Sequence, residues 1–174
     1  MSTGRFLHFA YASNMLKERM LCYNPTALKI FRGPAKLENY RLAFCRDWPL
    51  PGVWHGPTAN LRKSPGSHVW GVIWELEDKV KAELDSQEHT HQGLDLEVTD
   101  LRGNKFTCYA FAMRESQGQE EPPSPQYKDV IVRGGQQSEL PGEYIQTLKD
   151  LPDNGFTGRV AVYEDVLAIL KGKF

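Results

Sequence analysis

Apolar and polar positions along the chain recur at two different periods, and each period predicts one kind of element. Segments that alternate every second residue, or that are short and apolar, dominate the first two thirds of the sequence. Segments with apolar residues every third or fourth position dominate the last third. The predicted strands are 6–11, 27–31, 40–46, 58–62, 69–76, 94–100 and 105–113. The predicted helices are one that starts directly after Asn14, then 77–88, 126–133, 141–151 and 165–171.

Turn residues separate several of these segments. Arg102-Gly103-Asn104 joins two alternating strands and predicts a β-hairpin. Ser64-Pro65-Gly66 predicts a turn, and the proline-rich segment 116–126 predicts either a linker or an ordered loop that packs over a site. Strands followed by helices in 174 residues predict one α+β domain, residues 1–174, with a curved sheet or small β-barrel and peripheral helices.

Composition and charge exclude several functional classes. The 21 basic and 22 acidic residues are mixed along the chain, so we expect no nucleic acid partner. No apolar run approaches the ~20 residues of a membrane span, so we expect no membrane partner. The N-terminus lacks a secretory signal pattern, and Cys22, Cys45 and Cys108 lack CxxC spacing. We therefore expect a cytoplasmic protein with reduced thiols.

The junction after the first predicted strand is the first candidate site. The stretch FLHFAYASNML, residues 6–16, passes from strand to helix through Ala12, Ser13 and Asn14 alone. A helix that begins at a strand end offers free backbone N–H groups to an anion, and small residues let a ligand approach them. A tight junction capped by Ser13 or Asn14, with no ligand, explains the same pattern.

Glu88 is the second candidate, because it follows a predicted helix and precedes a predicted strand. A carboxylate at such a junction can act as a general base if burial raises its pKa, although most are simply solvated. His89 and His91 beside it form an HxH pair, which raises a metal site as a rival. The pair lacks the third placed ligand that zinc sites show. The sequence contains no GxSxG, GK[ST], HExxH or GxGxxG motif.

Five motifs in order give the chain a resemblance to a known family. They are FAYASN at 9–14, HGPTANL at 55–61, SPGSHVWGVIWEL at 64–76, LDSQE at 84–88 and PPSPQY at 122–127. Together they resemble γ-glutamylcyclotransferases of the animal type, in the wider family that includes the AIG2-like proteins. The resemblance covers roughly residues 6–158. It implies a small mixed β-barrel with helices around it, a homodimer, and a lyase that needs neither metal nor cofactor. The implied reaction converts γ-glutamyl-amino acids into 5-oxoproline and the free amino acid.

The resemblance also assigns residues. It places the catalytic glutamate at Glu88 and a substrate-contacting tyrosine at Tyr127. Ala12 replaces the glycine that is usual in the family's substrate loop, and we expect it to keep a negative φ with ordinary strand or bridge dihedrals. The implied substrate-binding residues are His8, Phe9, Ala10, Tyr11, Ala12, Ser13, Asn14 and Tyr127.

Two alternatives remain open at this stage. The first is a γ-glutamylamine cyclotransferase that acts on an isopeptide such as γ-glutamyl-lysine, with the same site chemistry and a different pocket for the leaving amine. The second is a catalytically silent member of the family that binds a small anion. Ala12 favours the silent protein, whereas retention of Glu88 and Tyr127 opposes it, since a buried carboxylate is costly to keep.

Overall fold

The computed structural model describes residues 4–22, 26–46, 52–87, 91–113 and 118–172. Its strands are β1 Arg5–Ala10, β2 Lys29–Arg46, β3 Thr58–Glu77, β4 His91–Asp100, β5 Lys105–Met113 and β6 Gln119–Glu120. Its helices are the 3₁₀ turn η1 Ser13–Met15, then α1 Lys17–Met20, α2 Asp78–Gln87, α3 Pro125–Gln137, α4 Gly142–Lys149 and α5 Ala161–Leu170. Among these residues, no helix is long and apolar enough to cross a membrane.

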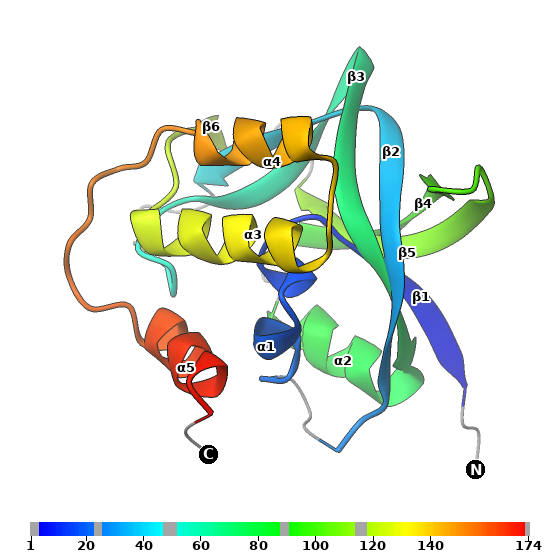
Figure 1. The fold of residues 1–174 in the computed structure, drawn as a ribbon, viewed down its shortest axis with the longest axis horizontal. Coiled ribbons are helices and arrows are strands. Elements are labelled where there is room, and N and C mark those ends of the chain that lie inside the picture. Colours follow the sequence, from blue (N-terminus) through cyan, green and yellow to red (C-terminus); the bar gives the residue numbers. More distant parts are fainter. Residues whose placement is uncertain (1–3, 23–25, 47–51, 88–90, 114–117, 173–174) are drawn as a thin grey trace.

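Strands β1 to β5 close into a barrel, with β6 added at the edge of β2 (Figure 1). The order around the barrel is β3-β1-β5-β4-β2, and β2 pairs with β3 to complete the ring. Only the β1–β5 pairing among these is parallel, which makes the barrel mixed. The α+β class and the small mixed barrel are therefore confirmed, as is the β4–β5 hairpin.

Strands β2 and β3 are longer than the sequence pattern predicted. Strand β2 joins the predicted segments 27–31, of which it includes 29–31, and 40–46, and β3 joins the predicted segments 58–62 and 69–76. The predicted turn at Ser64-Pro65-Gly66 is wrong, because Tyr40 pairs with Lys63 while Glu38 pairs with His68. The turn residues therefore form a bulge inside β3. Bulges bend a long strand around a closed barrel, so turn chemistry here marks curvature and not a strand end.

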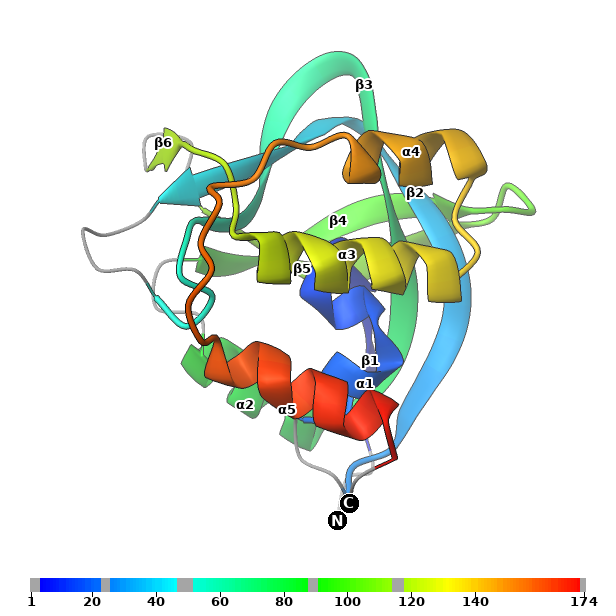
Figure 2. The same cartoon turned by 60° about the vertical axis from the view of Figure 1, so that its left-hand side comes forward.

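The helices cover one side of the barrel. Figure 2 shows α3, α4 and α5 in front, with η1 and α1 behind them against the strands. Helix α3 approaches η1 closely at Gly134, where an added Cβ would lie 2.9 Å from both the Leu16 nitrogen and the Met15 Cβ. Met15 and Leu16, which face Gly134, are buried, as is Met20 of α1. This contact fixes the end of β1 beneath α3.

Candidate active site

The segment after β1 is anchored to the barrel by two hydrogen bonds. The Tyr11 hydroxyl donates to the Phe111 carbonyl oxygen at 2.5 Å, and the Trp74 indole N–H donates to the Asn14 carbonyl oxygen at 2.9 Å. Phe9, Ala10 and Tyr11 are buried, as is His8, whose Nδ1 lies 2.9 Å from the Tyr109 carbonyl oxygen. The strand pairs with β3 and β5 on its two sides, so its end is held firmly at the barrel rim.

The turn itself differs from the predicted capped helix. Residues 13–15 form a single 3₁₀ turn, and Leu16 is extended (φ −76°, ψ 123°) before α1 begins. Neither Ser13 nor Asn14 caps it through a side chain, so that prediction was wrong. Within the described part of the chain, the Ser13 and Asn14 N–H groups have no acceptor, and the Asn14 Oδ1 atom is buried without a donor. A buried amide oxygen and two open N–H groups are polar groups that a ligand can satisfy.

Ala12 adopts φ −136° and ψ −129°. The negative φ agrees with the expectation, but the ψ value lies outside the ordinary strand and bridge ranges, so that part was wrong. The methyl group packs against the hydrophobic core. Because φ is negative, this position does not need the left-handed freedom of glycine.

Tyr127 lies in the first turn of α3. Ser124 caps this helix by accepting a hydrogen bond from the Tyr127 N–H at 3.2 Å, and Pro125 follows as the first helical residue. The Tyr127 side chain is 4% exposed, and its hydroxyl oxygen accepts the Ala59 N–H at 3.1 Å. The phenol is therefore fixed between α3 and β3.

Trp54 connects Tyr127 to the helix that follows the loop. Its ring lies 4.9 Å from the Tyr127 ring, and the Arg19 guanidinium of α1 lies 5.9 Å from the Trp54 ring. The structure thus brings the loop and Tyr127 to the same side of the barrel through Trp54 and Arg19. Sequence reasoning missed both residues, although Trp54 stands directly before the HGPTANL motif.

Glu88 and His89 lie outside the described residues, so their predicted positions remain predictions. The described residues that flank positions 88–90 are Gln87, the last residue of α2, and His91, the first residue of β4. Among the described residues, no group of three or more histidines, cysteines, aspartates or glutamates is arranged to hold a metal ion.

The described part of the proline-rich segment is ordered. The Gly118 carbonyl oxygen accepts a hydrogen bond from Arg62, and the Glu121 N–H donates to the Phe44 carbonyl oxygen at 3.0 Å. The Pro123 carbonyl oxygen accepts the Asn154 N–H at 2.8 Å. Residues 118–126 are therefore structured against the barrel, with β6 at Gln119–Glu120 and the start of α3 at Pro125, and do not form a free linker.

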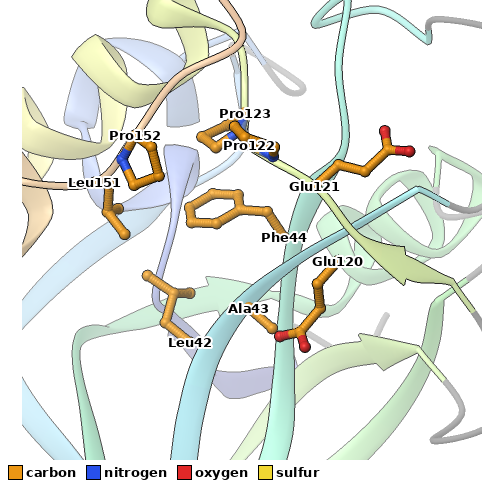
Figure 3. A pocket seen from close by; sticks show the side chains of 9 residues that line it. All are labelled: Leu42, Ala43, Phe44, Glu120, Glu121, Pro122, Pro123, Leu151 and Pro152. Carbon is orange, nitrogen blue, oxygen red and sulfur yellow. The ribbon is translucent and has the colours of Figure 1, made fainter.

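This segment borders a shallow open groove beside Tyr127, whose ring meets the Phe44 ring edge to face with centroids 6.0 Å apart. Figure 3 shows the Phe44 ring at its centre, with both glutamate side chains on the side away from Leu151 and Pro152. Glu120 pairs with Arg41, and Glu121 pairs with Arg46. The groove contains no residue assigned to substrate, and its two carboxylates are already neutralised by arginines. Its lining residues are Leu42, Ala43, Phe44, Glu120, Glu121, Pro122, Pro123, Leu151 and Pro152.

The cysteines give no support to a thiol nucleophile. Cys22, Cys45 and Cys108 are all free, and the last two are buried. Burial raises the pKa of the Cys108 thiol to about 12, so this group stays protonated at neutral pH.

Comparison with known proteins assigns the family. The chain is 36% identical over 171 residues to the human protein named gamma-glutamylcyclotransferase, covering 95% of this chain and 88% of the relative. The bovine protein of the same name matches to the same extent. This chain belongs to the γ-glutamylcyclotransferase family. The AIG2-like family profile matches residues 68–148.

A solved structure of a γ-glutamylcyclotransferase supports the same assignment. It superposes with a TM-score of 0.88 at 34% identity, covering 97% of this chain and 99% of the other. YkqA from Bacillus subtilis superposes with a TM-score of 0.69 at 22% identity and shares the fold. The barrel and its surrounding helices are thus those of the γ-glutamylcyclotransferases.

Proposed function

We propose that this protein is a γ-glutamylcyclotransferase that converts γ-glutamyl-amino acids into 5-oxoproline and the free amino acid. One observation carries the proposal: the chain is 36% identical to enzymes of this name across 95% of its length. The ordered loop after β1 and the buried Tyr127 support it, because both sequence-assigned elements lie on one side of the barrel.

The reaction suits a site with few catalytic groups. The substrate's own α-amine attacks its γ-carbonyl carbon, forms the C–N bond of a five-membered ring and expels the amine of the amino acid. Both reacting groups belong to one molecule, and well-oriented intramolecular reactions reach effective molarities of ~10⁵ M or more. The protein must bind the substrate in a folded conformation and move two protons.

Glu88 is the proposed general acid and base. Its carboxylate accepts one proton from the α-ammonium group, which makes the amine nucleophilic, and donates it to the leaving nitrogen as the C–N bond breaks. The second proton, which the ring nitrogen loses after the attack, passes through the same carboxylate to the released amine, which departs as an ammonium ion. One carboxylate thus serves both steps and ends the cycle ionised again. No resident metal or cofactor takes part in this scheme, so chelation with EDTA is expected to leave turnover unchanged.

The loop is the proposed binding site for a substrate anion. The Ser13 and Asn14 N–H groups would hold either the α-carboxylate or the oxyanion that develops on the γ-carbonyl. Residues 8–12 lead into the loop, and Tyr127 would line the pocket from α3. Trp74 and Phe111 hold the loop backbone in place before substrate arrives.

The two alternatives are less well supported. The relatives that carry the proposal are all named gamma-glutamylcyclotransferase, which does not favour an isopeptide enzyme. Against a silent protein, Ala12 has a negative φ and its methyl group packs on the core. A cytoplasmic location and a homodimer of this single domain, residues 1–174, belong to the same proposal, and light scattering tests the dimer.

The decisive experiment is incubation of the purified protein with γ-Glu-Ala, glutathione and γ-Glu-ε-Lys, with 5-oxoproline measured by chromatography. We expect turnover of γ-Glu-Ala. Turnover of γ-Glu-ε-Lys alone would establish the isopeptide enzyme. Binding of 5-oxoproline without turnover of any substrate would establish the silent protein.

A further inference from the structure

Tyr109 connects strand β5 to helix α2. Its neighbours Cys108 and Ala110 are fully buried while Tyr109 is partly exposed, so its side chain points out of the barrel. The Tyr109 hydroxyl donates to Asp85 Oδ1 at 2.6 Å, and the Lys81 ammonium lies 4.3 Å from the centre of its ring. Lys81 and Asp85 are four residues apart on α2. One phenol therefore contacts two successive turns of that helix.

Gly93 of β4 provides the space for this contact. A Cβ at Gly93 would lie 1.7 Å from the Tyr109 hydroxyl oxygen and 2.1 Å from Cζ. The phenol thus crosses the β4 backbone at a position where no side chain fits. Gly93 is not among the residues with positive φ, so its role is steric and not conformational.

Two aromatic rings on the same outer face of the sheet also contact the Tyr109 ring. The rings of Phe6 and Phe111 meet it edge to face, with centroids 6.0 and 5.3 Å away. Phe6 belongs to β1, the strand that leads to the loop at Tyr11. The same aromatic contacts therefore join α2 to the strand that carries the proposed anion site.

We propose that Tyr109 is a positioning residue: with Asp85, Lys81 and Gly93 it holds the last turn of α2 on the barrel, and the proposed catalytic Glu88 follows that turn directly in the sequence. This proposal rests on the proposed function. Val80 and Leu84 are buried in the first two turns of the helix, and the hydrogen bond from Tyr109 holds Asp85, the residue directly after Leu84. Glu88 is the first residue after α2.

The physical reason is that the rate of proton transfer falls steeply when the base is displaced from its proton. A general base acts only within hydrogen-bond reach of its proton, and a misplacement of about 1 Å can cost up to about a hundredfold in rate. The hydroxyl remains a donor at assay pH, because burial, the hydrogen bond to Asp85 and the charges of Asp85 and Asp95 raise the pKa of Tyr109 to about 12.

The test compares Tyr109→Phe with Tyr163→Phe. Both variants keep the ring and remove a hydroxyl that donates to an aspartate, since the Tyr163 hydroxyl donates to Asp129 at 2.7 Å between α5 and α3. We expect kcat for γ-Glu-Ala to fall about tenfold in Tyr109→Phe with KM changed less than about twofold, and to stay unchanged in Tyr163→Phe. Equal losses of kcat in the two variants would overturn the proposal, as would full kcat in Tyr109→Phe.

Variants of Asp85 test whether its hydrogen bond with Tyr109 carries the effect on kcat. Asp85→Asn keeps an acceptor oxygen and should retain kcat within about threefold, whereas Asp85→Ala should match Tyr109→Phe. The double variant Tyr109→Phe/Asp85→Ala should be no slower than Asp85→Ala, because both changes remove one interaction. If the two kcat losses add in the double variant, Tyr109 and Asp85 do not act through one shared interaction.

Hydrogen exchange separates this proposal from the proposed function. In Tyr109→Phe, peptides covering residues 81–93 should exchange about tenfold faster, whereas those of β2 and β3 should not change. If the wild-type protein forms no 5-oxoproline, the proposed function fails and Tyr109 has no catalytic group to position. Unchanged exchange in residues 81–93 would instead show that Tyr109 does not hold α2, whatever the activity.

Discussion

The Tyr11 hydroxyl donates a hydrogen bond to the Phe111 carbonyl oxygen at 2.5 Å, across the parallel pair formed by β1 and β5. This bond joins the first residue of the loop to the strand beside it, and both residues are buried. The hydroxyl is thereby directed toward the backbone of the barrel, and Tyr11 shapes the loop instead of presenting its hydroxyl to substrate.

Tyr11→Phe should destabilise the protein. The substitution keeps the ring but leaves the buried Phe111 carbonyl oxygen without this donor, which typically costs about 1–3 kcal/mol in the free energy of unfolding. Urea denaturation followed by circular dichroism measures it. Tyr163→Phe is the control, because its partner Asp129 is accessible to water and its loss should cost less. Equal losses in the free energy of unfolding in the two variants would contradict a special role for the buried Tyr11–Phe111 hydrogen bond.

Glu88→Gln should remove most of the activity while the fold persists. Glutamine keeps the size and polarity of the side chain but cannot accept the α-ammonium proton, so kcat should fall by ~10²–10⁴. Glu83→Gln makes the same change within α2 and should leave kcat near the wild-type value. Near-full activity in Glu88→Gln, with unchanged circular dichroism, would rule out Glu88 as the proton shuttle.

Ala12→Gly should have a small effect. The φ of −136° is open to alanine, so restoring the family's usual glycine should alter kcat/KM only a few-fold, about 1 kcal/mol or less. The added chain freedom should destabilise the fold by about 0.4–1 kcal/mol. Steady-state kinetics and denaturation measure the two effects. A rise of a hundredfold from almost no activity would identify the natural chain as a silenced enzyme.

Gly93→Ala should be strongly destabilising unless Tyr109 is also reduced in size. The new methyl group would overlap the Tyr109 phenol, which must then leave Asp85 and Lys81. We expect a loss of about 1–3 kcal/mol in a Tyr109 background and much less in a Tyr109→Ala background. A double-mutant cycle in urea measures the difference. Independent, additive costs would show that the two residues do not share this space.

Alkaline pH should weaken the fold in part through Tyr109. Its pKa is raised from 10.0 to about 12 in the folded protein, chiefly by burial. Between these values the unfolded chain loses the phenol proton while the folded protein keeps it, so stability falls as pH rises. Tyr109→Phe lacks this contribution. The difference in the free energy of unfolding between wild type and variant should therefore shrink from pH 10 to pH 12. Urea denaturation at a series of pH values measures it. A constant difference would contradict the raised pKa of Tyr109.

The sequence by itself determined the class of fold and the order of its parts. Local signals decided these features: period-two alternation predicted β4 and β5, and the Arg102-Gly103-Asn104 turn predicted their hairpin. Helical spacing predicted a helix at 126–133, which lies within α3. Such signals depend only on residues that are close in the sequence, so they can be interpreted without knowledge of the tertiary structure. The motif order also sufficed to assign the family.

Tertiary structure decided what local signals could not. Ser64-Pro65-Gly66 forms a bulge and not a turn because β3 must bend around a closed barrel against β2. The junction after Tyr11 is a 3₁₀ turn without a side-chain cap because Trp74, Phe111 and Gly134 hold it from outside. The contact of Tyr109 with Asp85 joins residues 24 apart and needs the space above Gly93. Each of these depends on segments distant in sequence, whose packing and hydrogen bonding override local preference.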